Sequence, residues 1–192
     1  MKTYNWLKQN RLLSHLPTTF CALTIVGASL ALPSAEADRP PPNANGGFIP
    51  CFNILNPATD IQQAGPNTII TFNVTAALTD TLNGSTTGTE RDVIHPDGYI
   101  TFEGTLVFNG SVDGRSGTFL ATYTGEGNAN PTESVHGLLP GEENAQFVGD
   151  HGTDDLAGLH AHGTFHGFLG TPMNGCAFSG QGEYSGYILF AP

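Results

Sequence analysis

The sequence predicts an all-β protein, a single antiparallel closed β-barrel of about eight strands. Beyond the first 47 residues, no stretch sustains the hydrophobic period of a helix. Short segments instead alternate polar and apolar residues, and Gly, Asn-Gly and Pro-Asp-Gly separate them. Eight strands of this kind close naturally into a small barrel, which leaves no sheet edge exposed.

Eight segments carry the strand pattern. They are separated by turn residues, among them Asn83-Gly84, Pro96-Asp97-Gly98, Asn109-Gly110 and Asp113-Gly114. The expected strands span residues 49–55, 68–78, 86–94, 99–108, 116–125, 145–148, 158–169 and 177–190.

The two-residue alternation also predicts which side chains face the lumen. In the segment 68–78, Phe72 shares a face with other apolar residues, whereas Thr71 and Asn73 lie on the opposite face. A lumen of this composition is either filled by its own side chains or open to one small apolar ligand. The expected lumen residues are Phe72, Phe102, Phe119, Tyr123, Phe165 and Tyr184. A β-bulge would turn Glu103 or Glu126 inward and add a carboxyl group to the lumen.

Residues 1–37 have the three parts of a secretory signal peptide. A basic start precedes an apolar run of 11 residues at 22–32, and Ala35-Glu36-Ala37 supplies a small-x-small cleavage site. The run is far shorter than the roughly 20 apolar residues that span a bilayer. We therefore expect cleavage after Ala37 and a secreted or periplasmic protein. Residues 38–47 are predicted to be a disordered lead-in rich in Pro and Gly, and residues 48–192 the barrel domain.

The charge of the expected mature chain excludes several functions. Cleavage would leave 16 acidic residues against three arginines and no lysine, a formal charge of −13. Nucleic acids and anionic membrane surfaces require basic residues, so neither is an expected partner. Schiff-base chemistry requires a lysine. The sequence contains no cofactor motif, and we expect the protein to have no cofactor.

Two cysteines remain after cleavage, Cys51 and Cys176. An even pair in an exported chain predicts a disulfide, and the absence of a Cys-x-x-Cys motif disfavours a redox role. This bond would join the start of the barrel domain to its last hairpin.

His160 and His162 are the clearest candidate metal ligands. Residues i and i+2 of a strand point the same way, roughly 7 Å apart, so both could bind one ion. His166 lies too far along the strand for the same ion, and His151, Asp154 or Glu183 would have to provide a third ligand. The alternation places the histidines on the solvent side, so the alternative is an ordinary exposed polar face. Asp150, Asp154 and Asp155 lack the calcium-loop pattern and are expected to form a solvated turn.

Two segments of the chain share the tripeptide Gly-Thr-Phe and are similar to segments of a known protein family. They are Gly114-Arg115-Ser116-Gly117-Thr118-Phe119 and residues 152–165. Together with residues 102–106 and 123–125, they resemble an uncharacterised, mostly bacterial family with an allene-oxide-cyclase-like β-barrel. The resemblance covers roughly residues 67–170 and implies the barrel fold without an agreed activity. The named enzyme of that superfamily cyclises an unsaturated fatty-acid epoxide.

Three functional hypotheses follow from these observations. The first is a binding module for a small apolar ligand or a partner. The second is a lumen-based cyclase or isomerase that acts on a small unsaturated substrate, with a tyrosine or carboxyl group as acid or oxyanion stabiliser. The third is surface metal binding through His160 and His162. No catalytic residue is assigned from the resemblance.

Overall fold

The computed structural model describes residues 43–170 and 175–191. The predicted signal peptide and the start of the lead-in lie outside these residues. The described strands are β1 (Ala44–Asn53), β2 (Ile61–Ala64), β3 (Asn67–Leu78), β4 (Leu82–Ile94), β5 (Tyr99–Val112), β6 (Arg115–Asn128), β7 (Glu142–Asp150), β8 (Leu159–Gly170) and β9 (Phe178–Phe190). A short helix α1 (Pro57–Asp60) and a 3₁₀ turn η1 (Asp154–Leu156) complete the secondary structure. Neither approaches the length or hydropathy that a membrane-spanning helix needs.

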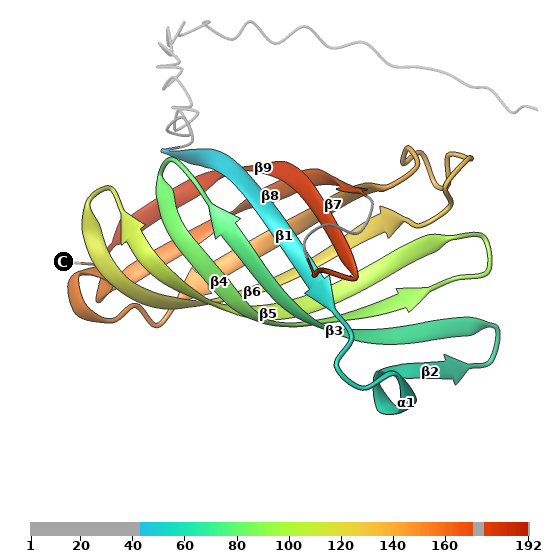
Figure 1. Cartoon of the computed structure of the whole chain (residues 1–192). Helices are drawn as coiled ribbons and strands as arrows, with labels where there is room; N and C mark the ends of the chain where they lie inside the picture. The colour runs from blue at the N-terminus through green and yellow to red at the C-terminus, as the bar shows by residue number, and fades with distance from the viewer. Residues whose placement is uncertain (1–42, 171–174, 192) are drawn as a thin grey trace, which may run out of the picture. The chain divides into compact units, whose positions relative to one another are not determined.

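Strand β1 closes the sheet into a barrel. From β3 to β9 each strand pairs antiparallel with the next, and β1 pairs antiparallel with both β9 and β3. Phe48, for example, lies opposite Gly182 on one side and Leu78 on the other. Figure 1 shows β1 between β3 and β9 across the front of the barrel. The predicted antiparallel barrel of eight strands is confirmed.

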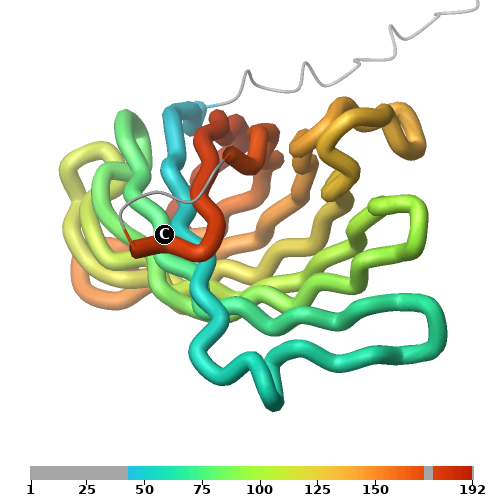
Figure 2. Tube along the Cα trace, turned by 45° about the vertical axis from the view of Figure 1, so that its right-hand side comes forward, coloured from blue at the N-terminus to red at the C-terminus, as the bar shows by residue number. Residues whose placement is uncertain are grey.

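Strand β2 is a ninth strand that the sequence pattern did not reveal. It pairs only with the first part of β3, Ile61 opposite Ile70, and all four of its residues are exposed. Helix α1 precedes it, capped by the Asn56 side chain, which accepts a hydrogen bond from the Ala58 backbone N–H at 3.2 Å. Both segments lie outside the closed ring of strands (Figure 2). Because β2 buries no side chain, its sequence lacks the alternation of apolar and polar residues by which a strand is predicted.

The inward faces predicted for β3, β5 and β6 are confirmed. Phe72, Val74 and Leu78 of β3 are buried, and the same alternation holds in β5 and β6. The core extends around the whole barrel, from Phe52 on β1 to Ile188 on β9. The six predicted lumen aromatics all belong to this core or pack against it.

Two features at the strand ends differ from the sequence prediction. The disordered lead-in was predicted to reach residue 47, but β1 begins at Ala44, whose side chain is buried. Gly46 and Gly47 suit this strand because they pass close to Tyr184 and Thr79.

Asn83-Gly84 and Asn109-Gly110 were predicted to form turns but lie inside β4 and β5, where Gly84 pairs with Gly110. Each lacks a side chain where the two backbones approach closely.

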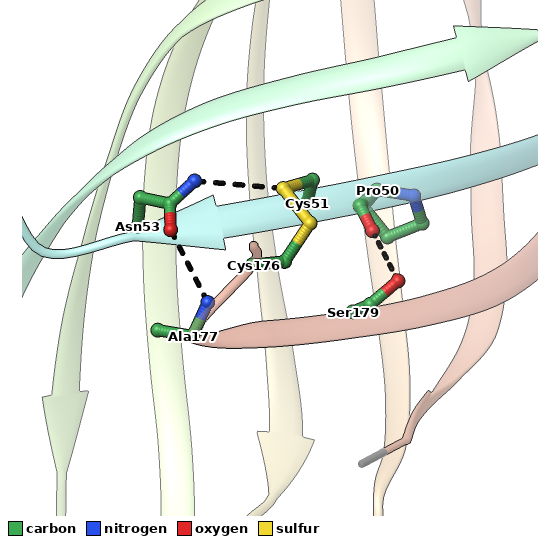
Figure 3. Close-up of a disulfide and its surroundings, with 6 residues drawn as sticks. All are labelled: Pro50, Cys51, Asn53, Cys176, Ala177 and Ser179. Carbon is green, nitrogen blue, oxygen red and sulfur yellow. Dashed lines mark hydrogen bonds between the residues drawn. A yellow bond between two sulfur atoms is a disulfide. The ribbon is translucent and has the colours of Figure 1, made fainter. Parts of the chain in front are cut away.

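The predicted disulfide between Cys51 and Cys176 is present (Figure 3). It links β1 to the residues just before β9, across the seam that closes the barrel. Hydrogen bonds surround it, including one from the Ser179 hydroxyl to the Pro50 carbonyl at 2.9 Å and one from the Ala177 N–H to the Asn53 side chain at 3.2 Å. The covalent bond and these polar contacts together fix the β1–β9 pairing.

Candidate functional site

Side chains fill most of the barrel lumen and leave a cavity of about 70 Å³. Every barrel strand except β9 contributes to the wall. The lining residues are Phe48, Pro50, Phe52, Val74, Ala76, Leu78, Thr86, Glu90, Phe102, Leu106, Tyr123, Glu143, Ala145 and Phe165. The wall is therefore mainly aromatic and aliphatic, with two carboxyl groups and two hydroxyls.

Tyr123 and Glu90 form the polar centre of this wall. The Tyr123 hydroxyl donates a hydrogen bond of 2.7 Å to the Glu90 carboxylate, although β5 separates β6 from β4. The residue between them on β5 is Gly104, which pairs with both Glu90 and Tyr123. A Cβ at Gly104 would collide with the Tyr123 ring. The missing side chain thus lets the ring lie across β5 and reach Glu90.

Asp92 and Glu143 extend the cluster along the lumen. Asp92 lies two residues after Glu90 on the inward face of β4, and the two carboxyl groups hydrogen bond to each other. Glu143 on β7 lines the same cavity and acts electrostatically on both. Glu90 and Asp92 are each only 5% exposed. We call Glu90, Asp92 and Glu143, with Tyr123, the lumen acidic cluster.

Burial dominates the proton affinity of this cluster, because an ionised carboxylate is poorly stabilised in an apolar lumen. Burial and the neighbouring charges of Glu90 and Glu143 raise the pKa of Asp92 to about 10. Burial also raises the pKa of Glu143 well above its usual range. The pKa of Glu90 is raised by burial, against the opposing effect of the hydrogen bonds with Tyr123 and Asp92. Asp92 therefore holds its proton at neutral pH, and the Tyr123 phenol, whose pKa is also raised by burial, stays neutral.

Two buried polar atoms on β4 lack a hydrogen-bond partner, one in the cavity wall and the other, roughly 20 Å along the strand, in the cluster. They are the Thr86 hydroxyl oxygen, which belongs to a residue of the cavity wall, and Asp92 Oδ1. Both residues are 5% exposed. Buried polar atoms are normally hydrogen bonded, so these two positions require water or a ligand atom.

Only part of the predicted aromatic lumen lines the cavity. Phe102, Tyr123 and Phe165 contribute to its wall. Phe72, Phe119 and Tyr184 instead fill the barrel elsewhere: Phe72 packs edge-on against Phe52, and Phe119 stacks on Phe108 with ring centroids 4.7 Å apart. The Tyr184 hydroxyl donates to the Thr79 carbonyl and accepts from the Leu82 N–H, at 2.7 and 2.6 Å.

Glu103 and Glu126, the carboxyl groups considered for the lumen, face outward. The β5–β6 register runs from Tyr99–Asn128 to Val112–Arg115 without the bulge that would turn them. Glu103 lies 3.8 Å from Arg91 on the surface, and Glu126 accepts a hydrogen bond from the Tyr99 hydroxyl. The inward carboxyl groups come from β4 and β7 instead.

Sequence reasoning missed the lumen acidic cluster because β4 is polar on both faces. Its inward residues include Thr86, Glu90 and Asp92, and its outward ones include Thr87, Thr89 and Arg91, so the strand carries no amphipathic pattern. The pairing of β3 with β4 would have indicated that Glu90 faces the lumen, because Glu90 lies opposite Phe72, which is an inward residue.

His160 and His162 are exposed on the outer face of β8, as the alternation predicts. The His162 ring stacks on Tyr187, with centroids 5.1 Å apart. The possible third ligands are elsewhere: His151 contacts Asp150 at 3.5 Å, and Glu183 pairs with His166. Within residues 43–170 and 175–191, no three His, Cys, Asp or Glu side chains lie together as a metal site would require.

The fold and the site together define an eight-stranded antiparallel β-barrel with an acidic, aromatic lumen. No family model matches the chain, and no curated protein matches it. Among solved structures, it is similar to a protein of unknown function from the DUF3224 family of Shewanella oneidensis MR-1. The TM-score is 0.53 and the identity 15%, over 78% of this chain and 96% of that chain.

This similarity shows a shared barrel fold. It agrees with the predicted resemblance to an uncharacterised bacterial family, whereas the likeness to allene oxide cyclase is not confirmed.

Proposed function

We propose that this protein is a binding module that holds one small molecule in the barrel lumen. The observation that carries the proposal is the cavity beside the lumen acidic cluster, where apolar walls surround Thr86 Oγ1, which lacks a partner. A binding site typically combines such walls with a few convergent polar groups. The volume of about 70 Å³ limits the ligand to a few heavy atoms.

Export of the protein is part of this proposal. The Cys51–Cys176 disulfide supports it, because such bonds form and persist mainly in oxidising compartments. The signal peptide pattern at residues 1–37 gives the same location.

Native mass spectrometry of the untagged chain from its own host tests the binding proposal, with two neighbouring alanines as a matched pair. Ala76 lines the cavity, whereas Ala77 is exposed on the outer face of β3. Ala76→Leu fills the cavity and should remove the co-purifying small molecule. Ala77→Leu adds the same atoms outside and should retain it. A ligand-free mass for the wild type contradicts an occupied lumen.

A second candidate function is proton-transfer catalysis, such as a small isomerisation. The hydrogen bond from Tyr123 to Glu90, with Asp92 beside it, favours this candidate because it places a neutral acid and a carboxyl base in one apolar site. The ionised form of Glu90 would take a proton from carbon and Tyr123 would donate to the developing oxyanion, with no other reactant consumed. A long fatty-acid epoxide is too large for the cavity, so the substrate would be small.

Deuterium exchange at the α-carbon of acetone in D₂O tests this candidate. The wild type should accelerate exchange over buffer, and Tyr123→Phe should lose about 10²-fold of that rate, in the range of general acid–base catalysis. Glu103→Gln, on the outer surface, is the control and should exchange like the wild type. An equal rate in Tyr123→Phe and the wild type would exclude the role of Tyr123.

A further inference from the structure

We propose that the ligand of the lumen is a small organic cation, an alkylammonium ion of a few carbon atoms. Its ammonium group would lie at the lumen acidic cluster, and its carbon atoms would contact the aromatic wall. This inference rests on the proposed binding function and names the chemical class of its ligand.

The charge distribution of the lumen favours a cation. Glu90, Asp92 and Glu143 influence one another electrostatically. The described residues contain two arginines and no lysine, and both arginines are outside: Arg91 is near Glu103, and Arg115 lies over the Phe190 ring. A buried carboxylate without a positive partner is unfavourable, so the empty site holds protons instead. A bound cation could replace a proton and supply the missing positive charge.

The unpartnered Asp92 Oδ1 points to a hydrogen-bond donor at the cluster, because it is a carboxyl oxygen. The unpartnered Thr86 oxygen lies six residues away on β4, roughly 20 Å, and is too far for the same ammonium group. Among the described residues, Tyr123 is the side chain that donates to the cluster from another strand, and Glu90 already accepts that bond. An ammonium group brings up to three N–H donors to such acceptors.

The rest of the wall suits the apolar part of an alkylammonium ion. Phe48, Phe52, Phe102 and Phe165 line the cavity together with Tyr123. Aromatic faces attract cations as well as hydrocarbon, and the attraction grows when the site excludes water. The small cavity volume admits a short alkyl chain and excludes larger ligands.

The pH dependence of binding distinguishes a cation from a neutral ligand. The titratable groups that line the site are Glu90 on β4, Tyr123 on β6 and Glu143 on β7, and Asp92 on β4 interacts with both Glu90 and Glu143; the lining residues on β1, β3, β5 and β8 are uncharged. An alkylammonium ion, like the lysine side chain, keeps its charge to about pH 10. It would displace a proton from the cluster, so its affinity should rise by about tenfold per pH unit for each proton released. A neutral molecule that accepts hydrogen bonds from protonated carboxyls should bind more weakly as the pH rises.

Isothermal titration calorimetry of the mature protein with propylamine and 1-propanol at pH 6, 7.5 and 9 tests the inference. Buffers of different ionisation enthalpy report the protons released by the wild type, so the main result needs no variant. Propylamine should bind at least tenfold more tightly than 1-propanol at pH 7.5, with proton release and an affinity that rises with pH. Glu90→Gln and Glu143→Gln should each weaken propylamine binding at least tenfold, whereas the surface variant Glu103→Gln should not.

The other outcomes separate the two proposals. If 1-propanol binds as tightly as propylamine, or if the affinity for propylamine falls as the pH rises, the inference of a cationic ligand is wrong. The lumen would still be a binding site. Binding of neither probe at any of the three pH values would count against both proposals.

Discussion

Asp92 is a residue whose ionisation should strongly affect the stability of the barrel. Because its pKa is raised to about 10, the folded chain holds this proton more tightly than the unfolded chain does. The stabilisation is complete below about pH 4, the ordinary range of an aspartate, and is lost as the pH rises toward about 10. One such proton changes the free energy of unfolding by up to about 1.4 kcal/mol per pH unit.

The substitution Asp92→Asn should remove this dependence, since an amide does not ionise. In urea unfolding between pH 5 and pH 9, the wild type should lose stability steadily and Asp92→Asn should lose distinctly less. Asp97→Asn, which changes an exposed carboxyl, is the control. An equally steep loss in Asp92→Asn and the wild type would show that Asp92 is ionised in the folded barrel.

Tyr184 stabilises the turn between β3 and β4 through two buried hydrogen bonds. Its hydroxyl donates a hydrogen bond to the Thr79 carbonyl and accepts one from the Leu82 N–H, and Tyr184 is only 2% exposed. Tyr184→Phe keeps the ring but leaves the Leu82 N–H without an acceptor. Chemical denaturation should show a loss of about 1–3 kcal/mol. Tyr187→Phe, whose ring lies on the outer surface beside His162, should change the stability by much less.

At the scale of elements, the disulfide locks the two strands that close the barrel. Cys51 and Cys176 are 125 residues apart, so the bond restricts nearly the whole unfolded domain. Removing it in the double variant Cys51→Ser/Cys176→Ser should lower the free energy of unfolding by about 2–5 kcal/mol.

Reduction of the wild type provides the check on the disulfide prediction. The wild type in reductant should unfold at the same denaturant concentration as the double variant, and the variant itself should not respond to reductant. Equal stability of the oxidised and reduced wild type would mean that the β1–β9 hydrogen bonds hold the seam without the bond.

The elements also show why some strands could be predicted and others could not. Strands β3, β5 and β8 alternate clearly, so their segments and faces followed from the sequence. Strand β2 buries nothing and was not predicted. Strand β4 was predicted over residues 86–94, but it has polar residues on both faces, so the sequence did not show which of them face the lumen. The position of Glu90 follows from its pairing with Phe72 and Gly104 across two neighbouring strands, which no local pattern reveals.

For the whole molecule, the sequence was sufficient for the barrel and the disulfide and gave three of the five aromatic residues that line the cavity. The barrel is predicted from alternating residues and turns that repeat along the whole chain. The prediction therefore stays correct even though one turn was wrongly placed at Asn83-Gly84. The acidic site depends on the packing of individual side chains, such as the Tyr123 ring lying over Gly104. Such contacts between neighbouring strands require the three-dimensional register.

The chain has a net charge of −11, and among the residues that the structure describes no lysine or arginine lies in the acidic lumen. The surrounding negative potential draws cations toward the protein and raises the proton affinity of the buried carboxyls further. The protonated state of the lumen acidic cluster is therefore the property on which both the binding site and its ligand class depend.

A ¹³C NMR titration of the side-chain carboxyl carbons tests that property most directly. Glu90, Asp92 and Glu143 should titrate above the ordinary carboxylate range, Asp92 at about 10, while the exposed Glu103 serves as an internal reference. Titration of all three lumen carboxyl groups near pH 4, together with Glu103, would contradict the buried, protonated cluster.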